Sequence, residues 1–475
     1  MTDEAGARDR PVARSSREQA LIEGPIAPTL VRFALPLLAT NLLHALTGTW
    51  AALWVSRELG EYALTAVANT TIFMWMVMGA VMGLGTSAGV AIGQSLGAGD
   101  RQGIRRVVGT TVSTAFGFGL VMAALGWMFT PMLLKGMNMP TESLADGITY
   151  MRWVCLTMPT FFVYVVMLMM LRGTGDARTP FRFNLVWIGL TLILTPLMIA
   201  GSGRLPGLGI AGAAIAGWVA HVIALVAMVL TLMRKRSPIA LRGPQLRHLI
   251  PHWPLVDRMA RRGAPMALES VLVQGAYFVL LGLVNRHGAD TAAAYSAAAQ
   301  LWGYVQMPAS AVASSMTAMA AMNIGAQLWP RVERIAWRGC IVGVSLTSLA
   351  TAVVYLLEDL LLGLFVPRGG EMLAQAREIN AIVLWGWIAL GITSSLCAVV
   401  RANSAMMAPT LIFAVTMWIF RVPCALALEP WLHEAAIWWS FPAGTLSSAL
   451  LAWAYYRWGR WRENRLMMAG VGVRN

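Results

Sequence analysis

Residues 234–262 read RKRSPIALRGPQLRHLIPHWPLVDRMARR, a basic, proline-rich stretch in a chain that is otherwise mostly apolar. It holds eight Lys or Arg, one acid (Asp257) and four prolines. Proline interrupts helical hydrogen bonding and so much charge resists burial, so no long hydrophobic helix can run through it. The stretch lies just past the centre of the 475 residues, and we expect it to link two parts of the molecule.

The composition on both sides of this linker indicates a polytopic membrane protein. Only 12% of residues are charged, 57% are hydrophobic and the mean hydropathy is +0.63, whereas soluble domains average about 25% charged residues. Apolar runs of about 20 residues, the length that crosses a bilayer as a helix, recur along the chain. The predicted fold class is therefore all-α integral membrane protein. We expect twelve transmembrane helices, near residues 31–56, 62–95, 107–131, 147–171, 181–201, 208–233, 263–286, 292–324, 333–362, 379–400, 407–428 and 434–456.

The net charge of +14 reflects membrane topology in this interpretation. The basic residues flank apolar runs and form no separate basic domain, so we expect no nucleic-acid partner. Of the 36 Lys and Arg, 27 fall in the tails and even-numbered loops and 6 in the odd-numbered loops. The positive-inside rule then places both termini and the linker in the cytoplasm, in a multi-pass protein of the bacterial cytoplasmic (inner) membrane. Residues 1–30 contain no apolar h-region, so no cleavable signal peptide is expected.

The two sides of the linker carry the same landmarks in the same order and at a nearly constant offset. The pairs are Pro36 and Pro265, Gly97 and Gly325, RGTGDARTP (172–180) and RANSAMMAP (401–409), and Thr195-Pro196 and Val422-Pro423. Each half holds six predicted spans, an even number, so both halves have the same orientation. This pattern predicts a parallel repeat of two pseudo-symmetric six-helix lobes, with a substrate site at the interface between them.

The predicted organisation follows from the spans and the repeat. It consists of a cytoplasmic N-terminal tail (1–30), an N-terminal lobe (31–233), the basic linker (234–262), a C-terminal lobe (263–456) and a cytoplasmic C-terminal tail (457–475). The end of the linker pairs Leu255 with Met259 among arginines, as a short helix lying on anionic lipid would.

Six segments along the chain carry further motifs. They are the segment around Pro36, WVSRELGEYALTAVA (54–68), GQSLGAGDRQGIRR (93–106), LRGTGDARTPFRF (171–183), LPGLGIAGAAIAGWVA (205–220) and WIFRVP (418–423). These segments resemble motifs of the multidrug and toxic compound extrusion (MATE) transporters. Each motif alone is weak, but their order on twelve spans is specific. The resemblance implies a V-shaped transporter that exports organic compounds by alternating access, driven by inward flow of H⁺ or Na⁺.

The chain departs from the family pattern in the N-terminal lobe. Ala51 stands where the family commonly has an Asp, and Thr191 and Thr195 stand where it has an Asn and an Asp. Hydroxyl groups cannot neutralise a buried cation as carboxylates do. We therefore expect no cation site in this lobe, no cofactor or metal, and H⁺ in preference to Na⁺ as the coupling ion.

Glu269 is the one acid well inside a predicted span. It lies four residues after Pro265, and Val273 stands where many relatives have a Glu. A carboxyl group in hydrocarbon is costly and is by default a functional candidate. The alternative is an ion pair with a nearby arginine, or a side chain that reaches towards the cytoplasmic surface near Arg262. Our hypothesis is that Glu269 carries the coupling proton, with Arg421 of the same lobe as its partner.

Polar residues of the first span form a second group of candidates. Asn41, His44, Gly48 and Ala51 share one helix face. Because histidine titrates near neutral pH, His44 is a further candidate for proton coupling; hydrogen-bonded packing is the alternative. Polar and aromatic side chains suit a cavity for varied organic molecules. The substrate-cavity candidates are Asn41, Asn69, Thr195, Gln274, Tyr277 and Tyr304.

The leading functional hypothesis is an antiporter that exports small lipophilic organic compounds or drugs as a monomer. Because buried acids are few, neutral or weakly charged substrates are favoured. A lipid-linked saccharide flippase of the wider superfamily is the alternative; it would need a cationic central cavity, for which only Arg152 and Arg421 are candidates. The sequence has no HExxH, no GxSxG and no paired intramembrane carboxylates, so we predict no enzyme activity. No pore-loop pattern suggests a channel.

Overall fold

The computed structural model describes residues 16–136, 139–201, 207–365 and 370–463, and within these ranges the regular structure is entirely helical. The first half comprises α1 (Ser16–Ile22), α2 (Ile26–Gly97), α3 (Arg101–Gly136), α4 (Thr141–Gly173), α5 (Arg178–Ala200) and α6 (Gly209–Arg234). A short helix, η2 (Gly243–Leu249), lies in the linker. The second half comprises α7 (Trp253–Arg286), α8 (Ala289–Gly325), α9 (Trp329–Leu356), α10 (Glu358–Leu362), α11 (Glu371–Val383), α12 (Gly386–Ala402), α13 (Met407–Val415), the π-helical turn η3 (Thr416–Arg421), α14 (Val422–Leu432), α15 (Ala435–Trp458) and η4 (Arg460–Glu463).

Each of the twelve predicted spans coincides with a helix. The helix α2 contains the first two spans, which meet at Gly60, where φ is 82°. Nine helices of the described chain are long and apolar enough to cross a bilayer, and α11 with α12 forms a further span bent by 43°. The remaining two spans are α8 and α15, of 37 and 24 residues. The all-α membrane fold class is confirmed.

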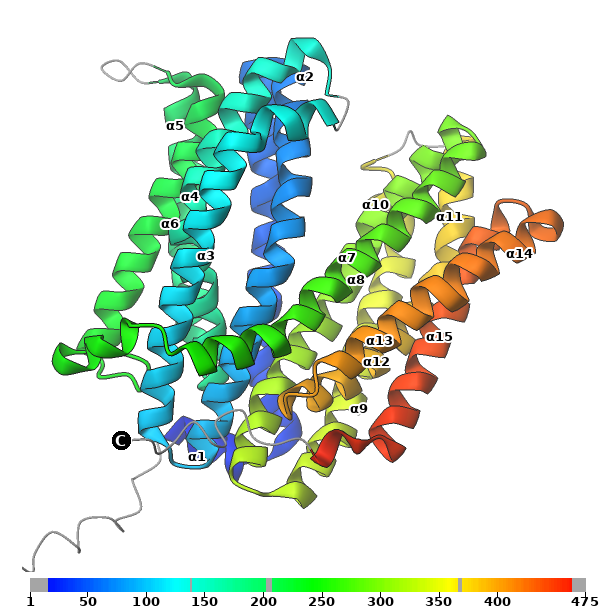
Figure 1. The fold of residues 1–475 in the computed structure, drawn as a ribbon. Coiled ribbons are helices and arrows are strands. Elements are labelled where there is room, and N and C mark those ends of the chain that lie inside the picture. Colours follow the sequence, from blue (N-terminus) through cyan, green and yellow to red (C-terminus); the bar gives the residue numbers. More distant parts are fainter. Residues whose placement is uncertain (1–15, 137–138, 202–206, 366–369, 464–475) are drawn as a thin grey trace, which may run out of the picture.

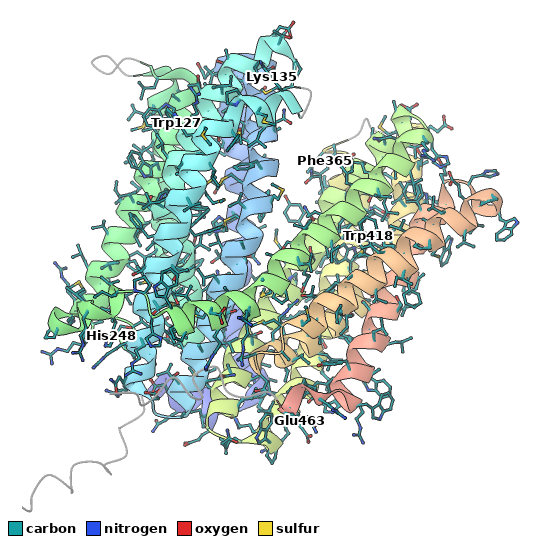
Figure 2. All side chains as sticks on the ribbon, in the orientation of Figure 1. Trp127, Lys135, His248, Phe365, Trp418 and Glu463 are labelled. Atoms are coloured by element: carbon teal, nitrogen blue, oxygen red, sulfur yellow. The ribbon has the colours of Figure 1, made fainter. Side chains whose placement is uncertain are left out.

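The helices form two lobes, one of α2 to α6 and one of α7 to α15 (Figure 1). The lobes lie together at the end of the molecule that carries the linker, and they diverge towards the other end. His248 and Glu463 lie at the joined end, whereas Lys135 and Phe365 lie at the diverging ends (Figure 2). The predicted two-lobe, V-shaped architecture is therefore confirmed.

The joined end is held by close contact between α2 and α8. A Cβ atom at Gly97 would collide with the Met322 carbonyl oxygen, and one at Gly325 would collide with the Gln94 carbonyl oxygen. Only glycine permits such an approach of two backbones. A hydrophobic core of the C-terminal lobe, formed mainly by α8, α9 and α12 and joined by residues of α1 and α2, surrounds this crossing; the N-terminal lobe has a core of its own, and the C-terminal lobe has a second one.

The first helix of each half begins inside the opposite lobe. Ile26 and Leu30 of α2 belong to the core formed mainly by α8, α9 and α12. Leu255 and Met259, at the equivalent positions of the second repeat, belong to the core of the N-terminal lobe. All four side chains are at most 2% exposed. The expectation that Leu255 and Met259 lie on lipid is therefore wrong.

The linker is docked on α3. The Ser113 hydroxyl donates to the Leu249 carbonyl, and the His252 N–H donates to Thr110 Oγ1 at 3.4 Å. The helix α7 begins at Trp253, so the last part of the predicted linker is already helical, and Figure 1 shows α7 running from one lobe into the other.

Both described ends of the chain lie at the joined end of the molecule. The helix α1 precedes α2 there, and Trp461 of η4 is buried while its carbonyl accepts a hydrogen bond from Asn403 Nδ2 at 2.6 Å. Of the predicted tails, residues 1–15 and 464–475 lie outside the described residues.

Candidate functional site at the junction of the lobes

A cavity of about 260 Å³ lies where the two lobes meet. Its walls come from α2 and α4 of one lobe and from α7, α8 and α12 of the other. Three methionines and five hydroxyl side chains line it, together with two arginines and several small residues. The methionines are Met82, Met169 and Met266, the hydroxyl residues are Thr86, Ser310, Ser314, Thr317 and Ser394, and the arginines are Arg172 and Arg401.

A larger hollow of about 610 Å³ lies on the linker face, between the ends of α3, α5 and α6. Basic side chains of helix ends and the linker line much of it, among them Arg101, Arg105 and Lys235. Because only the smaller cavity is formed by both lobes, it is the candidate site for a transported molecule.

Glu269 forms an ion pair with Arg401 beside this cavity. Arg401 Nη2 lies 2.6 Å from Oε1 and 2.9 Å from Oε2 of Glu269. The Thr410 hydroxyl lies 3.3 Å from Glu269 Oε2 and donates to the Pro265 carbonyl at 2.9 Å. Both charged side chains are 17% exposed, so water reaches them only in part. The hypothesis that Arg421 is the partner of Glu269 is wrong.

Arg401 occupies the last turn of α12, where unpaired helix carbonyls favour a positive charge. The chain then turns sharply, with Ser404 at φ 62°, before α13 brings Thr410 back to Glu269. The RANSAMMAP segment therefore places a cation and a hydroxyl around one carboxylate.

Arg172 holds the equivalent position in the other lobe, in the last turn of α4. Its Nε atom is buried without a hydrogen-bond partner, and no carboxylate within the described ranges forms an ion pair with its guanidinium. The residue that corresponds to Glu269, four positions after Pro36, is Thr40. One lobe thus supplies both members of an ion pair and the other only the cation.

His44 lies in the N-terminal lobe and is hydrogen bonded there. Its Nε2 atom is 3.1 Å from Asn184 Oδ1, and its ring centroid is 5.1 Å from that of Trp187. Asn184 is fully buried and donates through Nδ2 to the Pro180 carbonyl at 3.0 Å. The sequence analysis did not single out Asn184, which fixes the imidazole of His44 in place.

Arg421 is buried in the C-terminal lobe, away from the cavity. Its guanidinium carbon lies 4.9 Å from the ring centroid of Tyr277 and 4.7 Å from that of Phe441. Nη1 is 3.7 Å from Met417 Sδ. These contacts place Tyr277 and Arg421 together in a cation and aromatic cluster.

The other candidates are dispersed. Asn41 Nδ2 donates to Ser310 Oγ at 3.4 Å and so connects α2 with a residue that lines the cavity. Asn69 Nδ2 donates to the Thr65 carbonyl of its own helix at 3.1 Å. Thr195 is buried within α5, Gln274 is exposed and Tyr304 is partly exposed. Of the six cavity candidates, only Asn41 is brought to the edge of the cavity.

Two arginines were missed as site residues because their motifs were interpreted as helix ends and turns. The sequence did contain a signal for these arginines, because an arginine recurs at the same position of both repeats, at the end of an apolar helix. The argument that only Arg152 and Arg421 are deep basic residues is also wrong, since Arg172 and Arg401 line the central cavity. Arg152 instead lies 5.1 Å from the ring centroid of Trp127. In the described part of the chain, no group of three His, Cys, Asp or Glu side chains is arranged to hold a metal ion.

A family model and several known proteins match the sequence of this chain. The MatE family model matches the chain twice, at residues 36–197 and 265–426, and the two matches begin at the paired prolines Pro36 and Pro265, which confirms the repeat. The chain is 28% identical over 458 residues to "Probable multidrug resistance protein YoeA" of Bacillus subtilis, covering 95% of this chain and 98% of the relative. It is 26% identical over 306 residues to "FAD transporter" of Shewanella oneidensis, covering 64% and 67% of the two chains.

Solved structures show the same fold at low sequence identity. A crystal structure of MATE in the bent conformation has a TM-score of 0.85 at 19% identity, covering 97% of this chain and 100% of the other. The outward-facing conformation of a multidrug resistance MATE family transporter has a TM-score of 0.83 at 18% identity, covering 94% and 98%.

Proposed function

The chain belongs to the MATE family, and from this premise we propose that it exports small lipophilic organic compounds by secondary active transport across a bacterial cytoplasmic membrane. The observation that carries the proposal is the cavity built jointly by the two lobes. Thioether side chains adapt to varied apolar shapes, and the hydroxyl groups offer hydrogen bonds to polar ones. Relatives named as multidrug resistance proteins support export in preference to uptake.

We further propose alternating access by relative movement of the two lobes. The lobes are joined at the linker end and diverge at the other (Figure 1), and we place access to the cavity at the diverging end. With the linker and both termini in the cytoplasm, this state faces outward. The molecule functions as a monomer in this scheme, since the two lobes of one chain form the cavity.

Glu269 is the proposed site of proton coupling. A proton that binds its carboxylate removes the charge that holds Arg401, and so releases the contact of α7 with α12 and α13. A sodium ion would need several oxygen ligands, but the two carboxylate oxygens already accept hydrogen bonds from Arg401. This geometry favours H⁺ over Na⁺ as the coupling ion.

The test is dye exchange in proteoliposomes with pH and Na⁺ gradients imposed separately, using the uncharged lipophilic dye N-phenyl-1-naphthylamine. We expect the pH gradient alone to drive wild-type transport, and Glu269→Gln to reduce it at least about tenfold, because loss of the coupling proton removes the driving force. Glu333→Gln is the matched control, since Glu333 is 56% exposed and lies outside the cavity. Undiminished pH-driven exchange by Glu269→Gln contradicts the assignment.

A lipid-linked saccharide flippase is the second candidate function, because two arginines line the central cavity. Pyrophosphate recognition uses such cations. Expression in an efflux-deficient bacterium separates the two functions. Raised resistance to dyes that an uncoupler abolishes supports the exporter, whereas rescue of a cell-envelope defect supports the flippase.

A further inference from the structure

We infer that Arg172 binds the anionic group of the transported molecule, and that the substrates are amphipathic organic anions with a carboxylate or phosphate group. This inference rests on the proposed export function, whose substrate class it names. Four observations support it: the asymmetry of the repeat, the partial burial of Arg172, the lining of the cavity and the state of the second arginine.

Comparison of the two repeats shows that Arg172 lacks an acidic partner. In the C-terminal lobe, Arg401 is neutralised by Glu269, four residues after Pro265. In the N-terminal lobe, the same position after Pro36 is Thr40, whose hydroxyl donates to the Pro36 carbonyl at 2.8 Å. A hydroxyl carries no charge and so cannot neutralise an arginine as a carboxylate does. The acceptor for Arg172 must therefore come from outside the lobe.

Partial burial of Arg172 strengthens this requirement. Its Nε atom is inaccessible and has no hydrogen-bond partner. An arginine remains charged inside a protein, and withdrawing that charge from water is costly unless a partner compensates for it. Arg421 finds such compensation at the faces of Tyr277 and Phe441. Tyr164 and His44, which interact electrostatically with Arg172, are not acidic residues. A carboxylate or phosphate would bind the guanidinium through two parallel hydrogen bonds.

The cavity lining suits an amphipathic anion. The residues that form its wall include two arginines and no acid within the described chain. Hydroxyl groups of Thr86 and Ser314 line the same space and can donate to further oxygens of the anion. Three methionines supply an adaptable apolar surface for the rest of the molecule. A cationic substrate would have no countercharge here.

The two arginines are not equivalent as ligand-binding groups. Arg401 donates to both oxygens of Glu269, so its charge is satisfied within the protein. Arg172 is the arginine whose charge a ligand can satisfy. The inference therefore predicts a site that depends on Arg172 and that is lost if the missing acid is restored in the N-terminal lobe.

The experiment measures binding to the full chain in nanodiscs of zwitterionic lipid. The probe is 11-(dansylamino)undecanoic acid, with its methyl ester as the uncharged match, and protein-free nanodiscs supply the background. The variants are Arg172→Gln, Arg172→Lys, Thr40→Glu and Thr40→Gln. Thr40→Glu restores the acid of the other repeat, and Thr40→Gln adds the same bulk without the charge. Binding of the methyl ester reports whether each variant keeps an intact cavity.

We expect the wild type to bind the acid at least about tenfold more tightly than the ester. Arg172→Gln and Thr40→Glu should remove this preference and leave ester binding in place, whereas Arg172→Lys should retain part of it and Thr40→Gln most of it. Dodecanoate and dodecyl phosphate should both displace the probe better than dodecanol, and the stronger competitor identifies a carboxylate or a phosphate as the preferred group.

The inference is overturned if the acid and the ester bind equally well to the wild type, or if Thr40→Glu and Thr40→Gln have the same effect. Its failure is distinguishable from failure of the export function. Export of N-phenyl-1-naphthylamine without any Arg172-dependent preference for the acid overturns the substrate class alone. Arg172-dependent binding of the acid without export of any dye or of the acid overturns the export function alone.

Discussion

At the scale of single residues, Glu269 and Thr40 occupy one position of the two repeats and determine whether the arginine of the same lobe has an acidic partner. The sequence allowed Glu269 to be recognised, because an acid deep in an apolar span stands out from its neighbours. It did not allow recognition of Arg401 as the partner, since the two lie 132 positions apart and meet only because α7 packs against α13, which follows α12. The lack of an acidic partner for Arg172 could not be predicted either, because it depends on which side chains surround this residue in the folded protein.

His248 in the linker gives a prediction of pH dependence. Partial burial lowers the pKa of His248 from its usual value of 6.5, and the nearby charges of Arg247, Arg106 and Arg105 lower it further. The folded protein therefore binds this proton less readily than the unfolded chain. The contribution of neutral His248 to stability is present above pH 6.5 and is lost as the pH falls below that value.

We expect hydrogen exchange of residues 243–252, corrected for intrinsic rates, to quicken between pH 7.5 and 5.5 as the linker loosens from α3. His248→Gln should flatten this change, because glutamine gains no charge. His252→Gln is the matched control in the same segment. An unchanged pH response in His248→Gln argues against the assignment.

At the scale of elements, the sequence predicted the helices better than their ends. Apolar runs locate the part of each helix that lies in hydrocarbon, so each of the twelve predicted spans coincides with a helix of the described chain, and up to ten of these are long and apolar enough to cross a bilayer. The polar ends of the helices were not predicted to be helical. A helix that extends beyond the hydrocarbon can keep one charged face in water, so no apolar run marks its end. In α7, the arginines around Leu255 and Met259 suggested a linker, but these two side chains face the core of the N-terminal lobe.

The crossing of α2 and α7 gives a prediction for one element. A Cβ atom at Gly263 would lie 2.8 Å from the Gly83 carbonyl carbon, closer than van der Waals contact. Gly263→Ala should therefore destabilise the protein by about 1–3 kcal/mol through overpacking. Gly282→Ala on the same helix meets nothing within 4 Å and should leave stability unchanged or raise it. Thermal unfolding in detergent compares the two variants, and equal shifts in Tm would rule out a special role for the glycine crossing.

At the scale of the whole molecule, the repeat in the sequence predicted two lobes of like orientation. It could not predict how the lobes sit against each other, because that arrangement depends on contacts between them. Two buried amides, at equivalent positions of the two repeats, make such contacts at the joined end. Gln94 Nε2 donates to the Ala402 carbonyl at 2.8 Å, and Asn323 Nδ2 donates to the Leu21 carbonyl at 3.1 Å.

Removal of one of these contacts should shift the balance between lobe arrangements. Gln94→Ala leaves the buried Ala402 carbonyl without this donor, at a cost of about 1–2 kcal/mol. The population open at the linker end should then rise about 5–30-fold. Double electron–electron resonance between spin labels at Gln102 and Glu333, in a background without the four native cysteines, measures this distance.

Gln300→Ala is the control for this measurement, because Gln300 is exposed on α8 and makes no described contact between the lobes. Identical distance distributions for Gln94→Ala and the wild type would show that the amide does not hold the joined end.

Ile26 and Leu30 are buried in one lobe, and Leu255 and Met259 are buried in the other. This exchange has a consequence for the origin of the molecule. Each repeat lends the start of its first helix to its neighbour, which is the arrangement of a reciprocally domain-swapped dimer with its two chains fused. Neither repeat is then a complete folding unit, since each one needs the first turns of the other's leading helix to close its core. An ancestral single repeat would have faced the same requirement, and a pair of identical chains satisfies it with one two-fold axis.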